Sequence, residues 1–349
     1  MGNTVDIVHA LGFDNDDIEA CLQRRGLLSL ELEFTRKCNL RCVYCYSSAG
    51  ESDEGEMEIG EMKSVIAQAA DLGARKIILL GGGEPLVYDG LGEIVEYISG
   101  LGLRQVLFTN GTLMTDVTAH FLKRNDVSVV VKCNSMRPEV QDELAGVKGT
   151  FDRIRKGLEH LSNAGYPDGE TMLGVQTVIC RQNISELPAM WEWARRRDLI
   201  PYFEIMTNQG RAKLHPDLGV PSCEIKELFD KLDAIDKTNF GIARQSHPTI
   251  AAFSCRRHLY SCLVNSRGFV QPCTGVDMAV GNIREKSLAE ILSGSRVIED
   301  LRNIYERIEG ECRDCNQRHE CYGCRGNAYQ TTGNYLASDP SCWRCSACE

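Results

Sequence analysis

Three cysteines near the start of the chain stand close enough together to share one metal centre. Cys38, Cys42 and Cys45 follow the pattern C-x3-C-x2-C, and Tyr44 precedes the third of them. Soft thiolates packed this closely select an iron–sulfur cluster or a zinc ion. In a four-iron cluster, three thiolates leave one iron without a protein ligand, so that iron would be open to another molecule.

A second group of cysteines occupies the C-terminal part of the chain. It comprises Cys255, Cys262, Cys273, Cys312, Cys315, Cys321, Cys324, Cys342, Cys345 and Cys348. The chain has 17 cysteines, an odd number, and its N-terminus lacks the basic and then apolar layout of a signal peptide. We therefore expect metal or cluster ligation rather than a disulfide framework. Two structural zinc sites are the alternative, because C-x2-C pairs serve zinc equally well.

Length and composition limit the classes of function. The 349 residues give room for one large domain and a smaller one, and 43% hydrophobic with 25% charged residues is an ordinary soluble composition. A net charge of -10 argues against a broad basic surface for nucleic acid. No apolar run approaches the roughly 20 residues that cross a membrane. We expect a cytoplasmic protein with neither a nucleic-acid nor a membrane partner.

Two glycine-containing stretches follow apolar runs. Gly81, Gly82, Gly83, Glu84 and Pro85 form the first, in which glycines allow positive φ and let a backbone come close to a ligand. A tight strand-to-helix turn is the simpler interpretation. The second is the triplet at residues 109–111, where Thr109 and Asn110 precede a glycine; an ordinary Asn-Gly turn explains it nearly as well.

These motifs lie in a regular alternation of strands and helices. Apolar strand-like runs occur at residues 27–34, 76–80, 105–109, 127–132, 171–179 and 200–206. Helical patterns occur between them at residues 58–72, 91–101, 116–123, 151–164 and 187–197. This alternation predicts an α/β fold with a parallel sheet and helices outside it, either a barrel or a doubly wound sheet. Residues 1–26 read as a helical lead with Asp14 or Asn15 as its N-cap, and residues 265–268 as a hairpin turn.

Polar residues follow the later strands, where β/α barrels carry their chemistry. Cys133 and Asn134 end the fourth strand, Cys180 ends the fifth, and Arg211 follows the sixth. Asn134 could instead cap a helix, and Arg211 could brace its own loop. Both cysteines could simply pack as small apolar residues beneath the loops.

In these motifs the sequence resembles the radical S-adenosylmethionine (radical SAM) superfamily. The signature of that family is C-x3-C-x-aromatic-C, and its GGEP and TNG motifs match residues 82–85 and 109–111. The resemblance implies a partial (β/α)6 barrel in which SAM binds the open iron held by the first three cysteines. Glu84 would meet the amino group of SAM. The other residues expected around the cofactor are Gly81, Gly82, Gly83, Pro85, Thr109, Asn110, Asn134 and Arg211.

The C-terminal cysteines resemble a SPASM domain, which holds two auxiliary clusters. The matching patterns are Cys255-x12-Gly268-x4-Cys273 and Cys312-x2-Cys315-x5-Cys321, although the next gap, to Cys324, is x2 where the family usually has x3. The resemblance implies three [4Fe–4S] clusters and a small cysteine-rich α+β domain after the barrel. Cys255, Cys262, Cys273 and Cys324 would hold the nearer auxiliary cluster, and Cys312, Cys315, Cys321 and Cys342 the outer one. Cys345 and Cys348 would form a local metal-binding or disordered end.

The implied domains are a lead at residues 1–26, a radical SAM core at 27–221, a linker helix within 222–249 and SPASM at 250–349. The implied chemistry is reductive cleavage of SAM to a 5′-deoxyadenosyl radical, with a flavodoxin or ferredoxin as one-electron donor. That radical would abstract a hydrogen atom from the substrate.

The first expectation for the outcome is oxidative modification of a peptide or protein by cross-linking, thioether formation or dehydrogenation. Thr274, where sulfatase-maturing relatives have Asp, counts against that one peptide class. The second is a dehydrogenase or epimerase acting on a sugar, aminocyclitol or tetrapyrrole, in which Cys133 or Cys180 returns a hydrogen atom. The third is an Fe–S electron carrier or scaffold, which would not need the glycine loop.

Overall fold

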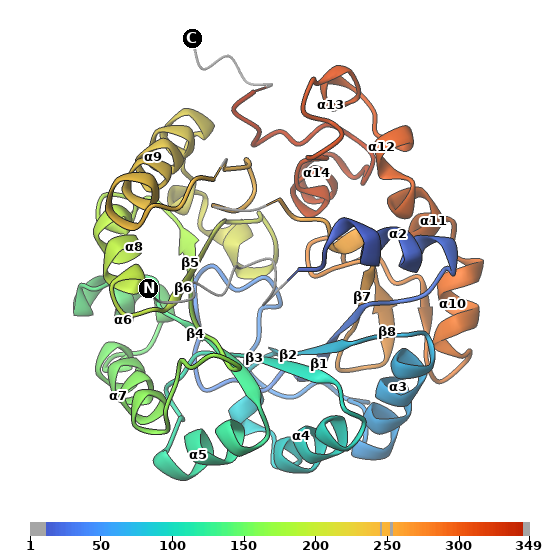
Figure 1. Ribbon diagram of the computed structural model, residues 1–349, viewed down its shortest axis with the longest axis horizontal. Helices are drawn as coiled ribbons and strands as arrows, with labels where there is room; N and C mark the ends of the chain where they lie inside the picture. Colours follow the sequence, from blue (N-terminus) through green and yellow to red (C-terminus); the bar gives the residue numbers. More distant parts are fainter. Residues whose placement is uncertain (1–11, 245, 252–253, 345–349) are drawn as a thin grey trace.

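A curved, open parallel sheet forms the centre of the computed structural model, which describes residues 12–244, 246–251 and 254–344 (Figure 1). Its first six strands lie in chain order and are all parallel. They are β1 (Ser29–Thr35), β2 (Lys76–Gly82), β3 (Arg104–Thr109), β4 (Val127–Lys132), β5 (Leu173–Ile179) and β6 (Ile200–Ile205). β1 and β6 do not pair, so the predicted partial barrel is confirmed.

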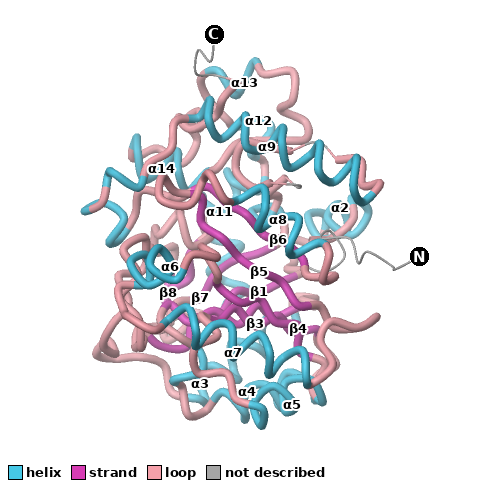
Figure 2. The backbone as a smooth tube through the Cα atoms, turned by 90° about the vertical axis from the view of Figure 1, so that its left-hand side faces the viewer, coloured by secondary structure: helices cyan, strands magenta, loops and turns pink. Residues whose placement is uncertain are grey.

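Helices cover the outside of this sheet, as the alternating pattern predicts. They are α3 (Ile59–Asp71), α4 (Leu91–Gly100), α5 (Asp116–Arg124), α6 (Pro138–Ala145), α7 (Thr150–Asn163) and α8 (Leu187–Arg195). In Figure 2, α3, α4 and α5 lie together along one side of the strands. α3 buries Met62, Val65, Ile66 and Ala69, the spacing of one helix face. α6 was not predicted from the sequence.

Strand β1 is buried along its whole length, yet it carries two carboxylates. Side chains alternate between the two faces of a strand. Leu30, Leu32 and Phe34 therefore join the outer core beneath the helices. Ser29 and Glu31 face the interior of the barrel, where they line a cavity.

The C-terminal residues continue the same sheet beyond β1. β7 (Ser261–Val264) pairs in parallel with β1, and β8 (Phe269–Gln271) and β9 (Gly281–Asn282) follow antiparallel. The predicted hairpin turn between β7 and β8 is confirmed, with Gly268 at a φ of 80° and the Asn265 side chain accepting from the Arg267 amide. The C-terminal region is therefore joined to the barrel by backbone hydrogen bonds.

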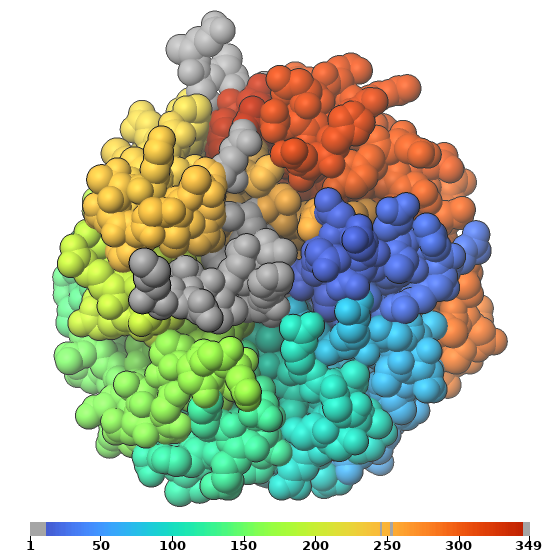
Figure 3. Space-filling view, viewed as in Figure 1, coloured from blue at the N-terminus to red at the C-terminus, as the bar shows by residue number. Residues whose placement is uncertain are grey.

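Short helices complete the C-terminal region and pack against the N-terminal helix. They are α10 (Leu288–Gly294), α11 (Arg296–Arg302), α12 (Ile304–Arg307), α13 (Glu311–Asp314) and α14 (Arg325–Thr332). α2 (Asn15–Gln23) begins at the predicted N-cap Asp14, whose carboxylate accepts from the Asp17 amide at 2.8 Å. Ile18 and Cys21 of α2 share an apolar cluster with Leu301. In Figure 3 the blue N-terminal residues lie directly beside the orange C-terminal ones.

Helix α9 (Ser222–Ile235), the predicted linker, ends in a π-helical turn, η4 (Asp236–Phe240). Asp236 is buried there, and its carboxylate accepts hydrogen bonds from Trp191 Nε1 at 2.7 Å and from Arg195 Nε and Nη2 at 2.9 Å each. This bridge fastens the linker to α8. Among the described residues, no helix is both long and apolar enough to span a bilayer.

We predict that Asp236→Ala lowers the free energy of unfolding by about 3–5 kcal/mol, because it leaves the buried Arg195 guanidinium without its carboxylate. Denaturant unfolding monitored by circular dichroism measures this change. Asp230→Ala is the matched control, since Asp230 makes only an exposed pair with Lys226 one helical turn away, and it should change stability by less than about 1 kcal/mol. Equal losses in the two variants would contradict the prediction.

Candidate functional site

A cavity inside the barrel brings together predicted site residues from distant parts of the chain. Its lining includes Cys38, Cys42, Cys45, Gly81, Gly82, Gly83, Glu84, Thr109, Asn110, Arg211 and Cys255. The first three belong to the loop after β1. Gly81 and Gly82 end β2, and Gly83 and Glu84 follow it. Thr109 ends β3, and Asn110 follows it. Cys255 comes from the C-terminal region, so both cysteine groups border the same space.

The three N-terminal thiols are free and border the cavity without converging on one point. Within the described ranges, no group of three or more His, Cys, Asp or Glu side chains is arranged to hold a single metal ion. In a four-iron cluster each thiolate binds a different iron, so its ligands stand apart around a larger body. Three separated thiols on one cavity wall fit a cluster better than a zinc ion.

The glycine loop packs against the backbone that leads into this cysteine loop. The Gly83 amide donates to the Thr35 carbonyl at 2.7 Å, and the Glu84 amide donates to the Lys37 carbonyl at 2.9 Å. A Cβ on Gly83 would lie 2.0 Å from the Lys37 carbonyl oxygen. Glycine is therefore required by close backbone contact, and the same contact holds the cysteine loop in place. Pro85 opens a short 3-10 turn, η1 (Pro85–Val87), directly after this contact.

Glu84 is buried at the cavity wall and holds the ends of β2 and β3 together. Its carboxylate accepts hydrogen bonds from Thr109 Oγ1 at 2.5 Å, from the Asn110 amide at 2.7 Å and from the Leu86 amide at 3.1 Å. Burial raises the pKa of Glu84 to about 7, against the effect of these donors. The carboxyl group is thus fixed in position and titrates near neutral pH.

Arg211 stabilises the cysteine loop through hydrogen bonds to two of its backbone carbonyl groups. It lies in η2 (Gly210–Leu214), and its side chain donates from Nε to the Cys42 carbonyl at 2.8 Å and from Nη1 to the Ala49 carbonyl at 2.7 Å. Gly210 has a φ of 56°, and a Cβ there would lie 2.2 Å from the Tyr46 carbonyl oxygen. Of the two roles considered for Arg211, the structure shows the loop-bracing one. A contact with the cofactor carboxylate stays a prediction.

Comparison with known proteins agrees with this arrangement. A model of the radical SAM superfamily matches residues 32–194, and a model of the SPASM iron–sulfur cluster-binding domain matches residues 255–316. The AdoMet-dependent heme synthase of Methanosarcina barkeri is 31% identical over 336 residues, which cover 89% of this chain and 94% of that one. The chain belongs to the radical SAM superfamily.

Other relatives and solved structures agree with this family. The mycofactocin maturase MftC of Mycolicibacterium smegmatis is 28% identical, with 91% of this chain and 84% of that one covered. The crystal structure of Streptococcus suis SuiB bound to S-adenosylmethionine shares the fold, with a TM-score of 0.70, 17% identity and coverage of 95% and 84%. This protein is therefore a radical SAM enzyme with a C-terminal SPASM domain, and the cysteine loop is the site where the family signature lies.

The SPASM cysteines fall into two groups. In the outer group the pKa of Cys321 is raised to about 11, first by burial and then by neighbours that include Cys342 and Cys312. Cys273 and Cys255 lie near Cys324. Cys262 lies on the other face of the sheet, away from these thiols, and Cys345 and Cys348 fall outside the described residues.

Backbone amides point at several of these sulfur atoms. The thiols of Cys38, Cys273, Cys315, Cys321 and Cys324 each accept an N–H from a residue two or three positions later, at 3.3–3.4 Å. Such N–H···S bonds stabilise thiolates in Fe–S sites and tune their potentials. All five cysteines belong to the predicted ligand sets, so the local backbone suits cluster ligation in both regions.

Asn134 lies beneath the cavity wall and does not line it. It is fully buried; its Nδ2 donates to the Tyr44 hydroxyl at 2.6 Å, and its Oδ1 accepts from the Val178 amide at 2.9 Å. These bonds tie the ends of β4 and β5 to the aromatic residue of the cysteine motif. Asn134 therefore positions the radical SAM loop, whereas direct contact with SAM stays a prediction.

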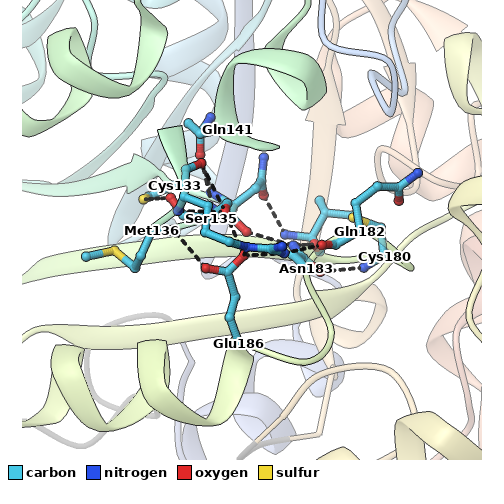
Figure 4. Close-up of polar contacts among 11 residues, drawn as sticks. Cys133, Ser135, Met136, Gln141, Cys180, Gln182, Asn183 and Glu186 are labelled. Atoms are coloured by element: carbon cyan, nitrogen blue, oxygen red, sulfur yellow. Dashed lines mark hydrogen bonds and ion pairs between the residues drawn. The ribbon is translucent and has the colours of Figure 1, made fainter. Parts of the chain in front are cut away.

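Cys133 and Cys180 do not line the cavity either. Figure 4 shows both residues among the polar contacts that follow β4 and β5. The Cys133 thiol donates to the Ser135 carbonyl at 3.6 Å. Cys180 packs in a small apolar cluster with Leu144 and Leu218. Burial raises the pKa of the Cys133 thiol to about 12 and that of Cys180 to about 11. The structure thus shows both thiols packed outside the cavity lining, and a role as hydrogen donor stays a prediction.

Several charged cavity residues were missed from the sequence. Arg257, in η5 (Arg257–Leu259), donates from Nη1 to Glu31 Oε1 of β1 at 2.9 Å and from Nη2 to the Tyr202 hydroxyl of β6 at 3.3 Å. It thereby spans the opening between the unpaired strands. Lys132 lies 3.9 Å from Glu204. The sequence did contain a signal for the strand residues among them, because charged residues occupy alternate positions of otherwise apolar strands.

We predict that SAM binding strengthens as the pH rises from 6 to about 7.5. The pKa of Glu84 is raised, so its carboxylate is ionised only as the pH passes about 7, and the ionised form is the stronger acceptor for the SAM amino group. Glu84→Gln should weaken binding about 10- to 100-fold, or roughly 1.5–3 kcal/mol for a hydrogen bond to a charged group, and remove the pH dependence. Anaerobic calorimetry measures both effects.

The control for this prediction is Glu96→Gln, which changes an exposed carboxylate on α4. It should leave affinity and its pH dependence unaltered. The iron content should stay the same in both variants. If Glu84→Gln binds SAM as tightly as the wild type at pH 7.5, Glu84 has only a structural role.

Proposed function

We propose that this enzyme oxidises a carbon atom of a substrate held in the barrel cavity. The observation that carries the proposal is that the loop of Cys38, Cys42 and Cys45 and the SPASM residue Cys255 border one cavity. When bound, SAM and the clusters supply a 5′-deoxyadenosyl radical and an acceptor for the electron left on the substrate. A substrate between the two cysteine groups would lie within reach of both.

The cavity walls suit a radical reaction because they exclude water and compensate charge internally. Apolar side chains such as Leu80, Phe108 and Val178 form part of the lining. Two oppositely charged pairs stand among them, Arg257 with Glu31 and Lys132 with Glu204. Pairing removes most of the cost of burying these charges and leaves them fixed. Such walls orient a substrate through fixed charges and apolar contact.

The cysteines on this cavity favour oxidation over epimerisation. Among the described residues that line it, the cysteines are Cys38, Cys42, Cys45 and Cys255, all of which belong to predicted cluster sites. A redox-neutral epimerase of the kind considered above would need a further thiol to return a hydrogen atom. Removal of an electron from the substrate radical needs no such donor.

For the substrate we propose a tetrapyrrole that carries propionate groups. The support is the heme synthase relative, because this chain matches 94% of it, and a second relative named Fe-coproporphyrin III synthase, at 28% identity. Loss of one hydrogen atom, one electron and carbon dioxide converts a propionate into a vinyl group. Lys132 and Arg257 line the cavity, and each would meet a substrate carboxylate in exchange for its present partner, Glu204 or Glu31.

A peptide is the second candidate. The mycofactocin maturase and the PqqA peptide cyclase of Xanthomonas axonopodis are 28% and 27% identical to this chain over about nine tenths of its length. This class was the first expectation from the sequence. For either substrate, we propose a flavodoxin or ferredoxin as the source of the electron that starts the reaction.

We predict that the reconstituted enzyme converts Fe-coproporphyrin III when SAM and a reductant are present. Each reacting propionate should lose carbon dioxide and two hydrogen atoms, and one 5′-deoxyadenosine should form per propionate. Anaerobic incubation followed by mass spectrometry measures both products. An enzyme that leaves tetrapyrroles unchanged but alters a precursor peptide would establish the second candidate instead.

We also predict about twelve irons per chain after reconstitution, at four per cluster. The Cys38→Ala, Cys42→Ala, Cys45→Ala triple variant should keep about eight and form no 5′-deoxyadenosine, by the same count. Iron analysis and chromatography of the nucleoside measure these outcomes. If the triple variant still cleaves SAM, the assignment of the radical site is wrong.

A further inference from the structure

The inside of the barrel carries a row of three polar side chains on β4, β5 and β6. Lys132 of β4 lies opposite Gln176 of β5, and Val178, two residues after Gln176, lies opposite Glu204 of β6. Residues two apart on a strand point to the same face of the sheet. Lys132, Gln176 and Glu204 therefore share one face, and all three line the cavity.

Lys132 brings an ammonium group with three hydrogen-bond donors to this row. Its Nζ lies 3.9 Å from Glu204 Oε1, too far for a hydrogen bond, and no acceptor among the described residues bonds to it. The Lys132 side chain is 18% exposed and that of Glu204 27% exposed, so a ligand can reach both. Arg257 differs, because its Nη1 and Nη2 already donate to Glu31 and Tyr202. Of these two cations, Lys132 is the one with unused donors.

Gln176 lets Glu204 part from Lys132 at little cost. The Gln176 side chain donates from Nε2 to Glu204 Oε1 at 2.5 Å. A carboxylate that keeps a hydrogen bond avoids the penalty of an unsatisfied buried group. An ion pair as long and as accessible as this one also stabilises little by itself. Lys132 can therefore turn to another carboxylate while Glu204 stays bonded.

Lys132 also lies next to the radical SAM loop. Its Nζ is 5.3 Å from the centre of the Tyr44 ring, and Tyr44 stands between Cys42 and Cys45 in the sequence. The Tyr44 hydroxyl accepts a hydrogen bond from Asn134 Nδ2 at 2.6 Å, which holds the ring in place. A carboxylate bound to Lys132 would thus lie on the side of the cavity that the cysteine loop borders.

We propose that Lys132 binds the carboxylate of the propionate that reacts, and that Glu204 takes Lys132 back once this carboxylate is lost. The inference rests on the tetrapyrrole substrate of the proposed function and names the residues that select it. The ring-side carbon of the propionate gives up a hydrogen atom to the 5′-deoxyadenosyl radical and an electron to the auxiliary clusters. The bond to the carboxylate breaks, carbon dioxide leaves, and a carbon–carbon double bond forms.

This exchange of partners makes the cavity prefer the substrate over the product. The vinyl group of the product has no charge with which to hold Lys132. Glu204 then pairs with Lys132 without competition, and the product loses its anchor. Before the reaction, Glu204 competes with the substrate carboxylate for the same ammonium group, so the two residues act on substrate affinity with opposite sign.

The first test compares affinities without turnover. Reconstituted enzyme, with SAM but without a reductant, is titrated anaerobically with Fe-coproporphyrin III and with its tetramethyl ester, and the porphyrin absorbance reports binding. Lys132→Met should weaken binding of the acid about 10- to 100-fold, the value of a hydrogen bond to a charged group, and leave binding of the ester unchanged. Lys132→Arg should restore most of the affinity for the acid.

Glu204→Gln should change the affinity in the opposite direction. It removes the charge that competes for Lys132 and keeps the shape of the side chain, so the acid should bind up to about fivefold more tightly, the value of a partly exposed ion pair. A purely structural pair would weaken binding in both variants. Lys123→Met is the matched control, because Lys123 pairs with Asp168 and does not line the cavity. It should alter neither affinity.

The second test measures how well the propionate is positioned. With a reductant and saturating Fe-coproporphyrin III, the wild type should form one 5′-deoxyadenosine per vinyl group. Lys132→Met should form more than one, because a propionate without its anchor is missed by some of the radicals. Chromatography of the nucleoside and mass spectrometry of the porphyrin give this ratio.

These outcomes separate the inference from the proposed function. Unchanged affinity for the acid in Lys132→Met, equal losses for acid and ester, or looser binding in Glu204→Gln would overturn the inference alone. Weaker SAM binding in Lys132→Met with unchanged porphyrin binding, measured by calorimetry, would assign Lys132 to the cofactor carboxylate, with the same consequence. A wild type that binds neither porphyrin would overturn the proposed tetrapyrrole substrate and the inference with it.

Discussion

Close backbone contact between the cysteine loop and the strand ends is the constraint on which the rest of this structure depends. A short loop has to present three sulfur atoms to one cluster, and few of its own residues can hold it in shape. Gly83 abuts Lys37 from β2, Asn110 donates from Nδ2 to Asn39 Oδ1 at 2.9 Å from β3, and Arg211 reaches the carbonyl of Cys42 from beyond β6. The parallel sheet brings these three strand ends together, so the shape of the barrel determines the position of the cysteine loop.

The same sheet fixes the relation between the radical site and the SPASM cysteines. β7 pairs with β1 in parallel, which places the C-terminal region one strand away from the loop that carries the radical site. Alternation along β1 sends Glu31 into the cavity and Leu30 outward, and the matching alternation along β7 sends Cys262 outward too. The direction in which a cysteine of a paired strand points is therefore set by the strand, whereas Cys255, outside the paired strands, lines the cavity.

Most of the fold was predictable, because the six parallel strands are long apolar runs separated by amphipathic helices. Motif spacing also identified the loops that meet at the cavity. The differences share a physical origin. Spacing places residues along the chain but does not say which face of the sheet they lie on, so it could not show that Asn134, Cys133 and Cys180, at the strand ends, lie outside the cavity lining. Helix α6 (Pro138–Ala145) was missed because eight residues cover too few turns for a helical pattern to stand out. Glu31 was overlooked because most residues of its strand are apolar.

Arg257 connects these observations at the mouth of the barrel. The strands β1 and β6 have no backbone bonds between them, and the Arg257 side chain joins Glu31 of the first to Tyr202 of the second. The guanidinium follows Cys255 by two residues, so the group that spans the opening is tied to a thiol of the auxiliary site. Removing one partner of a buried ion pair costs about 3–5 kcal/mol because the other charge is left unpaired. The width of the cavity and the position of Cys255 are therefore fixed by the same pair of charges, which makes the barrel and the SPASM domain one functional unit.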